Sequence, residues 1–351
     1  MVTGIVPPHL LDRIARLDDS RYARAATAAR RTLLQDPDFR AGRVGRTGRR
    51  GASAGVSAPR TGLHRTIGDA RQDETLPGTT VRTEGEPATG DAAVDEAYDG
   101  LGATYTLFSE VHGRNSIDGA GMPLLATVHY GRDYENAFWN GERMVFGDGD
   151  GEIFRRFTAS LSVIGHELAH GITEHTAELV YRDQPGALNE SVSDVFGVLV
   201  EQYLLRQDVE SASWLVGEGL FTDRVDGVAL RSMSAPGTAY DDPVLGTDPQ
   251  PGYMDDFIET TQDNGGVHLN SGIPNRAFHL TATALGGYAW ERAGRIWYAA
   301  LVSGLAPDTD FAGFAAATIA AAEAAHGPDS PEVAAVRDGW TGVGVDVDAT
   351  A

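Results

Sequence analysis

The segment His166-Glu167-Leu168-Ala169-His170 constrains this chain more than any other, because it places two imidazoles four residues apart. Residues four apart lie one turn above each other on one face of a helix. A helix here therefore lets His166 and His170 bind one metal ion. Glu167 lies beside that face, where it can hold a metal-bound water and act as a general base without ligating the metal.

A third ligand is predicted at Glu190, twenty residues after His170. Catalytic zinc sites have three protein ligands and leave a fourth position for water. Asp194 follows Glu190 by four residues, so its carboxylate is placed to accept the second ring N–H of a ligand histidine, and Asn189 is placed to do the same for the other. The alternative for the histidine motif alone is a partly buried helix with paired polar residues.

Four further segments accompany these residues, and the whole set closely resembles the thermolysin-like family of zinc metallopeptidases (M4). The resemblance runs from about Leu63 to the C-terminus, in order and with matching gaps. It rests on Asn136-Ala137-Phe138-Trp139, Met144–Gly151, Arg231-Ser232-Met233-Ser234 and Asp263–Gly272, together with the histidine motif and Asn189-Glu190.

The resemblance implies roles for residues outside the zinc motif. Tyr181 and His268 match the family's hydrogen-bond donors to the oxyanion, and Asp263 matches the carboxylate that orients His268 and raises its pKa. The alternatives are a core aromatic residue for Tyr181 and a loop histidine for His268.

Other matches concern substrate binding. Asn136 and Ala137 match edge-strand residues that bind an extended peptide through main-chain hydrogen bonds. Arg231 matches the arginine that contacts the carbonyl beyond the scissile bond; its alternative is a solvated surface charge. The pocket for the residue after the scissile bond matches six apolar positions, for which core packing is the alternative: Phe154, Phe157, Val163, Val216, Leu220 and Leu230. An apolar pocket predicts cleavage on the N-terminal side of bulky apolar residues.

The family's double calcium site is expected to be degraded in this chain. Glu201 and Glu218 match two of its carboxylates, but other matching positions hold Ser162, Ser213 and Leu215, and calcium needs six to eight oxygen ligands. The run Gly147–Gly151 contains two aspartates, but its three glycines favour a turn over a calcium site.

Charge divides the chain sharply. Residues 1–65 hold 13 arginines against 5 acidic residues, while the rest hold 15 arginines against 45. Residues 10–17 and 22–34 are predicted to be helical, and residues 40–62, rich in Arg, Gly, Ser and Ala, to form an exposed linker that a protease would cut. The Pro7-Pro8 and Leu10-Leu11 pairs resemble the short propeptide of the protealysin-like branch. Residues 1–62 are therefore expected to be a basic propeptide and linker, attracted to the acidic enzyme and acting as its intramolecular inhibitor. A basic tail for nucleic acid is disfavoured, because aromatic residues are scarce there and the acidic remainder would repel phosphate.

The fold class is expected to be α+β and two-lobed. Residues 63–165 should form a β-rich lobe, with a strand near 124–130, and residues 166–351 the zinc helix and a helical lobe. The zinc helix is predicted over about 159–176 and the others near 188–205, 271–286, 288–303, 311–326 and 331–338.

No apolar stretch is long enough to span a bilayer, and no secretory signal is recognisable at the N-terminus. Export by another route is favoured over the cytoplasm, and a monomer is expected. The function expected is that of a zinc endopeptidase made as a zymogen. The alternatives are an exopeptidase of the same zinc class and a non-catalytic zinc- and peptide-binding module.

Overall fold

A computed structural model describes residues 4–44 and 62–347, with only the backbone described for residues 36–44. The first lobe contains one mixed sheet in the order β2-β1-β3-β5-β4. β1 pairs in parallel with β3 and β3 with β5, while the outer pairs are antiparallel, so β4 lies at an edge. The strands are β1 Arg65–Asp69, β2 Thr79–Thr83, β3 Leu124–Val128, β4 Ala137–Trp139 and β5 Met144–Phe146.

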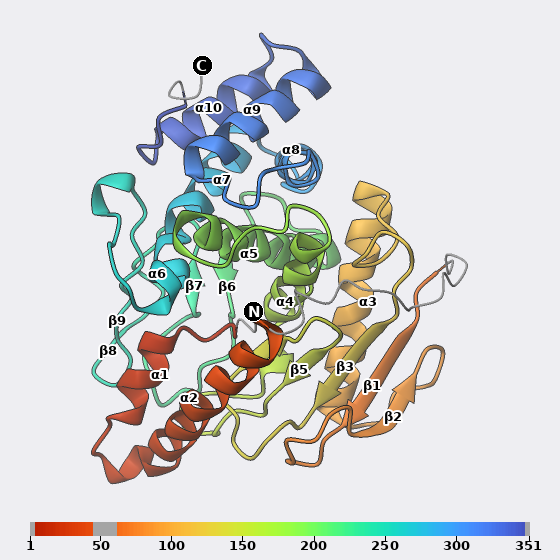
Figure 1. The fold of residues 1–351 in the computed structure, drawn as a ribbon, viewed down its shortest axis with the longest axis vertical. Helices are drawn as coiled ribbons and strands as arrows, with labels where there is room; N and C mark the ends of the chain where they lie inside the picture. The colour runs from red at the N-terminus through yellow and green to blue at the C-terminus, as the bar shows by residue number, and fades with distance from the viewer. Residues whose placement is uncertain (1–3, 45–61, 348–351) are drawn as a thin grey trace.

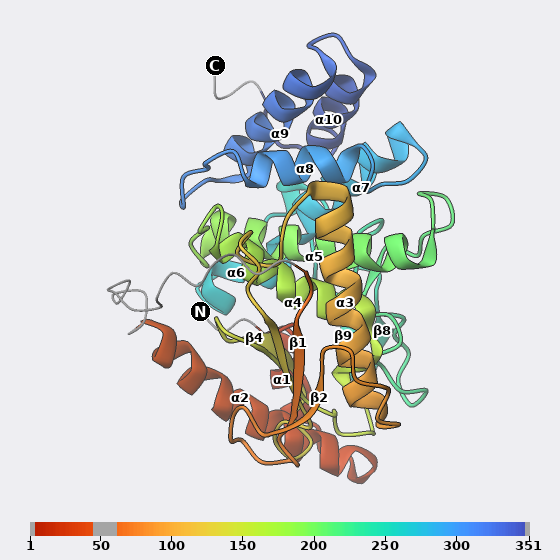
Figure 2. The ribbon, with the colours of Figure 1, turned by 90° about the vertical axis from the view of Figure 1, so that its right-hand side faces the viewer.

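A long helix, α3 (Ala92–His112), packs along this sheet (Figure 2). Asp91 caps its first turn by accepting hydrogen bonds from the N–H groups of Ala93 and Val94, and Gly113 ends it in the left-handed conformation, with a φ of 66°. The lobe thus contains strands and a major helix, and the sequence analysis had not predicted α3.

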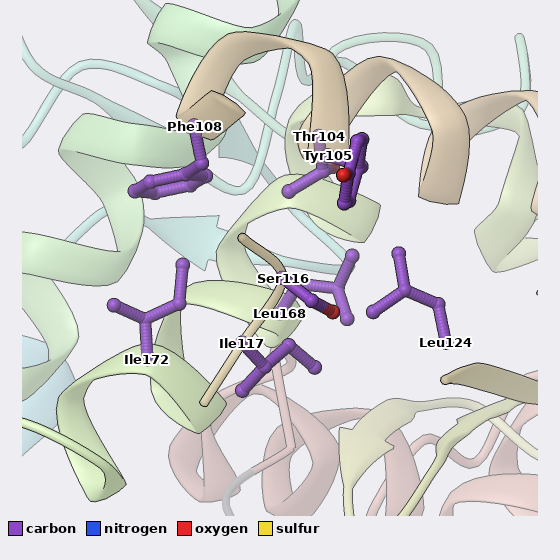
Figure 3. Close-up of a pocket in the computed structure, with 8 residues that line it drawn as sticks. All are labelled: Thr104, Tyr105, Phe108, Ser116, Ile117, Leu124, Leu168 and Ile172. Carbon is purple, nitrogen blue, oxygen red and sulfur yellow. The ribbon is translucent and has the colours of Figure 1, made fainter. Parts of the chain in front are cut away.

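The two central helices are α4 (Leu161–Glu174) and α5 (Asp183–Leu205), which pack against each other (Figure 1). Every residue of α4 from 162 to 173 is buried. Leu168 and Ile172 on α4 line a small, mainly apolar pocket together with Phe108 of α3 (Figure 3). Apolar packing therefore holds α4 against α3 and fixes the direction in which its polar residues point.

The second lobe is helical, as predicted, and its helices from residue 272 onward lie at the top of Figure 1. Its core includes the stacked indoles of Trp297 and Trp340, whose centroids are 6.0 Å apart. The helices are α6 Asp263–Asn270, α7 Gly272–Leu285, α8 Ala293–Leu301, α9 Phe311–His326 and α10 Pro331–Thr341. Two short strand pairs lie in the stretch between α5 and α6, namely β6 Leu215–Val216 with β7 Arg231–Ser232, and β8 Asp241–Asp242 with β9 Gly246–Thr247.

Residues 4–44, called here the N-terminal segment, contain α1 (Pro8–Ala15) and α2 (Ala23–Val44), which pack against each other. Both helices were predicted, but α2 runs on to Val44, so the predicted linker is helical over its first five residues. The remainder of that linker, 45–61, lies outside the described residues. No helix among the described residues is long and apolar enough to cross a membrane.

Candidate active site

Helix α4 presents the two predicted zinc ligands from one face. The Nε2 atoms of His166 and His170 lie 2.9 Å apart, and both side chains are buried. Helix α5 brings Glu190 against them, with one carboxylate oxygen 3.5 Å from Nε2 of His166 and the other 3.4 Å from Nε2 of His170. The three predicted ligands therefore converge.

This arrangement fits zinc. Ligand atoms about 2.1 Å from a tetrahedral zinc ion lie about 3.4 Å from one another, close to the separations found. One oxygen of Glu190 is buried and accepts no hydrogen bond, as expected of a ligand atom. Among residues 4–44 and 62–347, His166, His170 and Glu190 form the only group of three or more potential ligands so close together.

The Nδ1 atoms of both histidines form the predicted hydrogen bonds. Asp194 accepts a hydrogen bond from His166 Nδ1 at 2.7 Å, and Asn189 one from His170 Nδ1 at 2.8 Å. These contacts leave each Nε2 with its lone pair toward the site. The hydroxyl of Ser193 also lies 3.0 Å from His170 Nδ1, a contact that the sequence analysis did not assign. Burial lowers the pKa of His170 to about 3, so the imidazole is neutral.

Glu167 is next to the ligands but is not one of them. Its carboxylate accepts a hydrogen bond from the backbone N–H of Trp139 at 2.9 Å, which ties the predicted base to the edge strand β4. Its second oxygen is buried and accepts no hydrogen bond. Burial, and then the charge of Glu190, raise its pKa well above the usual value. An environment of this kind favours uptake of a proton.

Tyr181 and His268 lie next to each other and to Glu190. The Tyr181 hydroxyl donates a short hydrogen bond to Glu190 and lies 3.3 Å from His268 Nε2. His268 Nδ1 is 2.7 Å from an oxygen of Asp263. Burial alone would lower the pKa of His268, but Asp263 and Glu190 raise it to about 9. Both residues are buried beside the metal ligands. The alternatives, a core aromatic residue for Tyr181 and a loop histidine for His268, do not account for this position.

The local sequence explains how Asp263 reaches His268. Gly265 and Gly266 adopt φ values of 88° and 75°, which fold the chain back so that Asp263 also accepts the N–H of His268. A Cβ atom on Gly265 would lie 2.1 Å from a carboxylate oxygen of Asp183. Glycine at position 265 is thus required both by its positive φ and by the close approach of α5.

Arg231 is not a surface charge. Its side chain is 1% exposed, and its Nε and Nη2 atoms each donate to Asp194 at 2.8 Å. Asn275 also donates to Asp194 at 2.8 Å. Neither the Arg231–Asp194 pair nor the role of Asn275 was predicted from the sequence.

The six predicted pocket residues are all buried and belong to the main core. The rings of Phe154 and Phe157 lie 5.6 Å apart. A Cβ on Gly217 would lie within 3.1 Å of side-chain atoms of both Leu220 and Leu230, so these two leucines approach one point of the backbone. Val216 is the residue whose carbonyl accepts the N–H of Leu230.

The N-terminal segment crosses the site in an extended conformation. Ile5 N–H donates to the carbonyl of Ala137, and Val6 N–H donates to the side chain of Asn136. Gly4 forms an antiparallel bridge with Phe138. The two residues predicted to bind an extended peptide therefore bind residues 5 and 6 of this chain.

At the positions that match the family's double calcium site, the structure shows how Ser162 and Glu201 are engaged. Ser162 is buried, accepts the N–H of Gly217 at 3.1 Å and lies 3.1 Å from the hydroxyl of Ser160. Burial, and then the nearby Glu218, raise the pKa of Glu201. The hydroxyl of Ser162 is thus engaged within the protein where the resemblance implies a carboxylate, and the loss of the double calcium site stays a prediction.

The run Gly147–Gly151 is an irregular loop and not the expected turn. Asp150 accepts the backbone N–H of Ile153 at 2.7 Å, and Asp148 lies 2.9 Å from His129 Nδ1. Both carboxylates are therefore engaged within the protein.

A two-lobed fold that places two histidines and a glutamate around one point, with a separate buried glutamate beside them, defines a zinc metallopeptidase of the thermolysin type. The chain belongs to this family: the family model for the thermolysin metallopeptidase catalytic domain matches residues 58–174, and that for its alpha-helical domain matches residues 177–345. Members of the family are zinc-dependent metalloendopeptidases. The predicted family, fold class and cofactor are thereby confirmed.

Individual proteins of the family are similar to this chain over most of its length. An extracellular metalloprotease of Pectobacterium carotovorum is 50% identical over 349 residues, covering 99% of this chain and 97% of the relative. Protease PrtS of a Photorhabdus species is 55% identical over 288 residues, covering 81% and 77%. Among solved structures, the precursor of protealysin, a metalloproteinase from Serratia proteamaculans, is 51% identical, with a TM-score of 0.87 over 98% of this chain and all of that one.

Proposed function

We propose that this chain is the zymogen of a zinc endopeptidase that cuts on the N-terminal side of bulky apolar residues. The observation that carries the proposal is the extended N-terminal segment, which lies along β4 beside the three metal ligands, with Ile5 fully buried. A peptide held through its main chain, with residues of the chain on both sides of the held position, fits an endopeptidase cleft.

The roles follow from position. Zinc held by His166, His170 and Glu190 would polarise the scissile carbonyl and lower the pKa of water to about 7. Glu167 takes the proton of the attacking water and passes it to the leaving nitrogen. Tyr181 and His268 donate to the carbonyl oxygen as it gains charge, a contribution of about 10²–10³ in rate.

Specificity is assigned to the apolar pocket. Ile5 belongs to the same buried cluster as the six residues of the predicted pocket. Burying a leucine or phenylalanine side chain there stabilises a bound peptide by about 1.5–3 kcal/mol. Ala137 and Arg231 hold the N–H and the carbonyl of the residue at the Ile5 position, so only its side chain is selected by the pocket.

The N-terminal segment acts as the inhibitor. We place the prosegment and linker at 1–62, the strand-containing lobe at 63–165 and the zinc helix with the helical lobe at 166–351. Ile5 and Val6 occupy the groups that would bind substrate, so substrate binding requires their displacement. The names of the relatives support action outside the cell, and we expect the mature enzyme to be a monomer.

The test compares the full chain with its Glu167→Gln variant, using Glu174→Gln on the same helix as the matched control. Each protein is loaded with zinc and assayed on casein and on peptides blocked at both ends that carry either Leu or Asp after the scissile bond. Wild type and Glu174→Gln should cut casein and the Leu peptide, while Glu167→Gln should bind zinc and lose at least about 10²-fold in rate.

The two alternatives give different results. An exopeptidase would refuse the blocked peptides but cut unblocked ones. A binding module would bind zinc and peptide, and cut neither substrate after the prosegment has been removed by an added protease.

A further inference from the structure

Both sides of one peptide bond in the N-terminal segment meet the groups that hydrolysis needs. On the carbonyl side, the oxygen of Gly4 lies 3.1 Å from Nε2 of His268. On the nitrogen side, the N–H of Ile5 donates to the carbonyl of Ala137 at 3.1 Å, on the same strand whose Trp139 N–H donates to Glu167. The bond between Gly4 and Ile5 thus lies beside the proposed oxyanion donor and along the strand that holds the proposed base.

The residues that follow extend this alignment. Arg231 Nη1 donates to the carbonyl of Ile5 at 3.1 Å, and the Val6 N–H donates to the Asn136 side chain at 3.0 Å. Gly4 pairs antiparallel with Phe138. Successive polar groups of the segment are each satisfied, so the bond is held in one register.

We propose that the Gly4–Ile5 bond is itself a substrate, and that the chain cuts it in cis as a step separate from cleavage of the linker. Water adds to the carbonyl carbon of Gly4 and the C–N bond breaks, so that Gly4 becomes a carboxylate and the nitrogen of Ile5 becomes an amine that takes up a proton. The step consumes only water, and it rests on the proposed function.

This cut would not release the enzyme. The Ile5 amine stays beside the carbonyl of Ala137, and the helices that follow remain anchored. Leu10, Leu11 and Ile14 of α1 are buried, and Arg13 donates to the carbonyls of Pro243 and Val244 at 3.0 and 2.9 Å. The cut segment is therefore a bound product that still blocks the site.

Gly4 offers a variant that disturbs this register. A Cβ atom there would lie 2.1 Å from Nδ2 of Asn136, whose side chain is buried. Gly4→Ala should therefore misplace the bond without altering any metal ligand or the base. Gly313→Ala in α9 is the matched control.

The experiment follows the intact mass and the N-terminal sequence of the full chain after zinc is added, together with linker cleavage and casein hydrolysis. We expect a new N-terminus at Ile5 in wild type and Gly313→Ala, no cut in Glu167→Gln, and a cut slowed at least about tenfold in Gly4→Ala. The rate should be unchanged by a tenfold dilution, and casein hydrolysis should not rise until the linker is cut.

Three results would overturn the inference. An intact Gly4–Ile5 bond in protein that cuts its linker or casein refutes it and leaves the proposed function standing. A rate that falls in proportion to dilution shows cleavage between molecules. Zinc-loaded protein that cuts neither this bond, the linker nor casein, even after an added protease has removed the prosegment, refutes both proposals.

Discussion

Asp194 receives two hydrogen bonds from Arg231, each 2.8 Å long, and neither side chain is exposed to solvent beyond 1%. The same carboxylate bonds to Nδ1 of His166. Nearby positive charge holds the pKa of Asp194 below its usual range despite burial, and the charge of Asp194 raises that of Arg231. One carboxylate therefore links a metal ligand to the arginine that holds the bound chain at Ile5.

Arg231→Lys should weaken both zinc binding and the contact with the carbonyl of Ile5. Lysine keeps the charge but loses the two-pronged contact with Asp194. We expect zinc affinity to fall about 10–100-fold, as for other groups that orient a ligand histidine. Competition with a chromogenic chelator measures this. Arg155→Lys, at an exposed pair with Asp223, should leave zinc affinity unchanged, and an unchanged affinity in Arg231→Lys would disprove the link.

Calcium should not stabilise this enzyme. Because Ser162 is engaged by Gly217 and Ser160, a chelator selective for calcium should shift the melting temperature by less than about 1 °C, since no bound ion would be removed. A zinc-selective chelator should abolish casein hydrolysis, and added zinc should restore it. A melting temperature that rises by several degrees with millimolar calcium would contradict the prediction.

Ile5→Asp should activate the zymogen early. The substitution places a charge where a buried apolar side chain lies, at a cost of several kcal/mol to docking of the segment. Casein hydrolysis should therefore appear sooner after zinc is added. Leu34→Asp changes a side chain that is 75% exposed and should behave as wild type. An unchanged lag in Ile5→Asp would show that the segment is not the inhibitor.

Salt should alter docking of the N-terminal segment only slightly, despite its basic charge. Among the residues that the structure describes, its ion pair with the rest of the chain is Arg24–Asp133, with an arginine 58% exposed, and such a pair contributes about 0–1 kcal/mol. Arg13 and Arg31 donate to backbone carbonyls instead. The activation lag should change by less than about fivefold between low and high salt. A larger change would favour the attraction expected from the divided charge.

Glu135 should make stability fall with rising pH. It is fully buried, and its backbone N–H donates to Thr32 of α2. Burial, and then the neighbouring Asp150 carboxylate, raise its pKa well above 4.5. Since the folded state binds the proton more tightly, its contribution is complete below about pH 4.5 and is lost as pH rises through the folded pKa, at about 1.4 kcal/mol per pH unit.

Glu135→Gln should remove that slope. The variant and wild type should unfold alike near pH 4.5, and the variant should be the more stable at pH 8. Denaturant unfolding of zinc-loaded Glu167→Gln backgrounds, which avoid self-digestion, measures the difference. Glu142→Gln, at a side chain 56% exposed, is the control, and parallel pH profiles for wild type and Glu135→Gln would refute the assignment.

Local pattern was enough to predict the zinc ligands, because spacing along a helix determines which side chains share a face. The helices of the second lobe were predicted for the same reason. Arg231 is different: nothing within its own turn of chain reveals a partner on α5, so a surface charge was the natural alternative. The contacts of Ile5 with Ala137 and Arg231 join positions more than 130 residues apart, which no periodicity encodes. Helix α3 was not predicted, because its apolar residues are interspersed with glycine and threonine, which weakens the helical pattern.

Strand β1 has a partner on each side, β2 and β3, and it begins at Arg65, only a few residues after the proposed linker. Arg65 also stacks on Tyr98, whose ring lies between the guanidinium groups of Arg65 and Arg82, each 3.6 Å from its centroid. Removing β1 would leave the two neighbouring strands with unpaired edges inside the lobe. The sequence position at which the prosegment can be removed therefore has a C-terminal limit. A cut before Leu63 leaves the sheet complete, whereas a cut a few residues later removes part of β1 and disrupts the sheet of the enzyme.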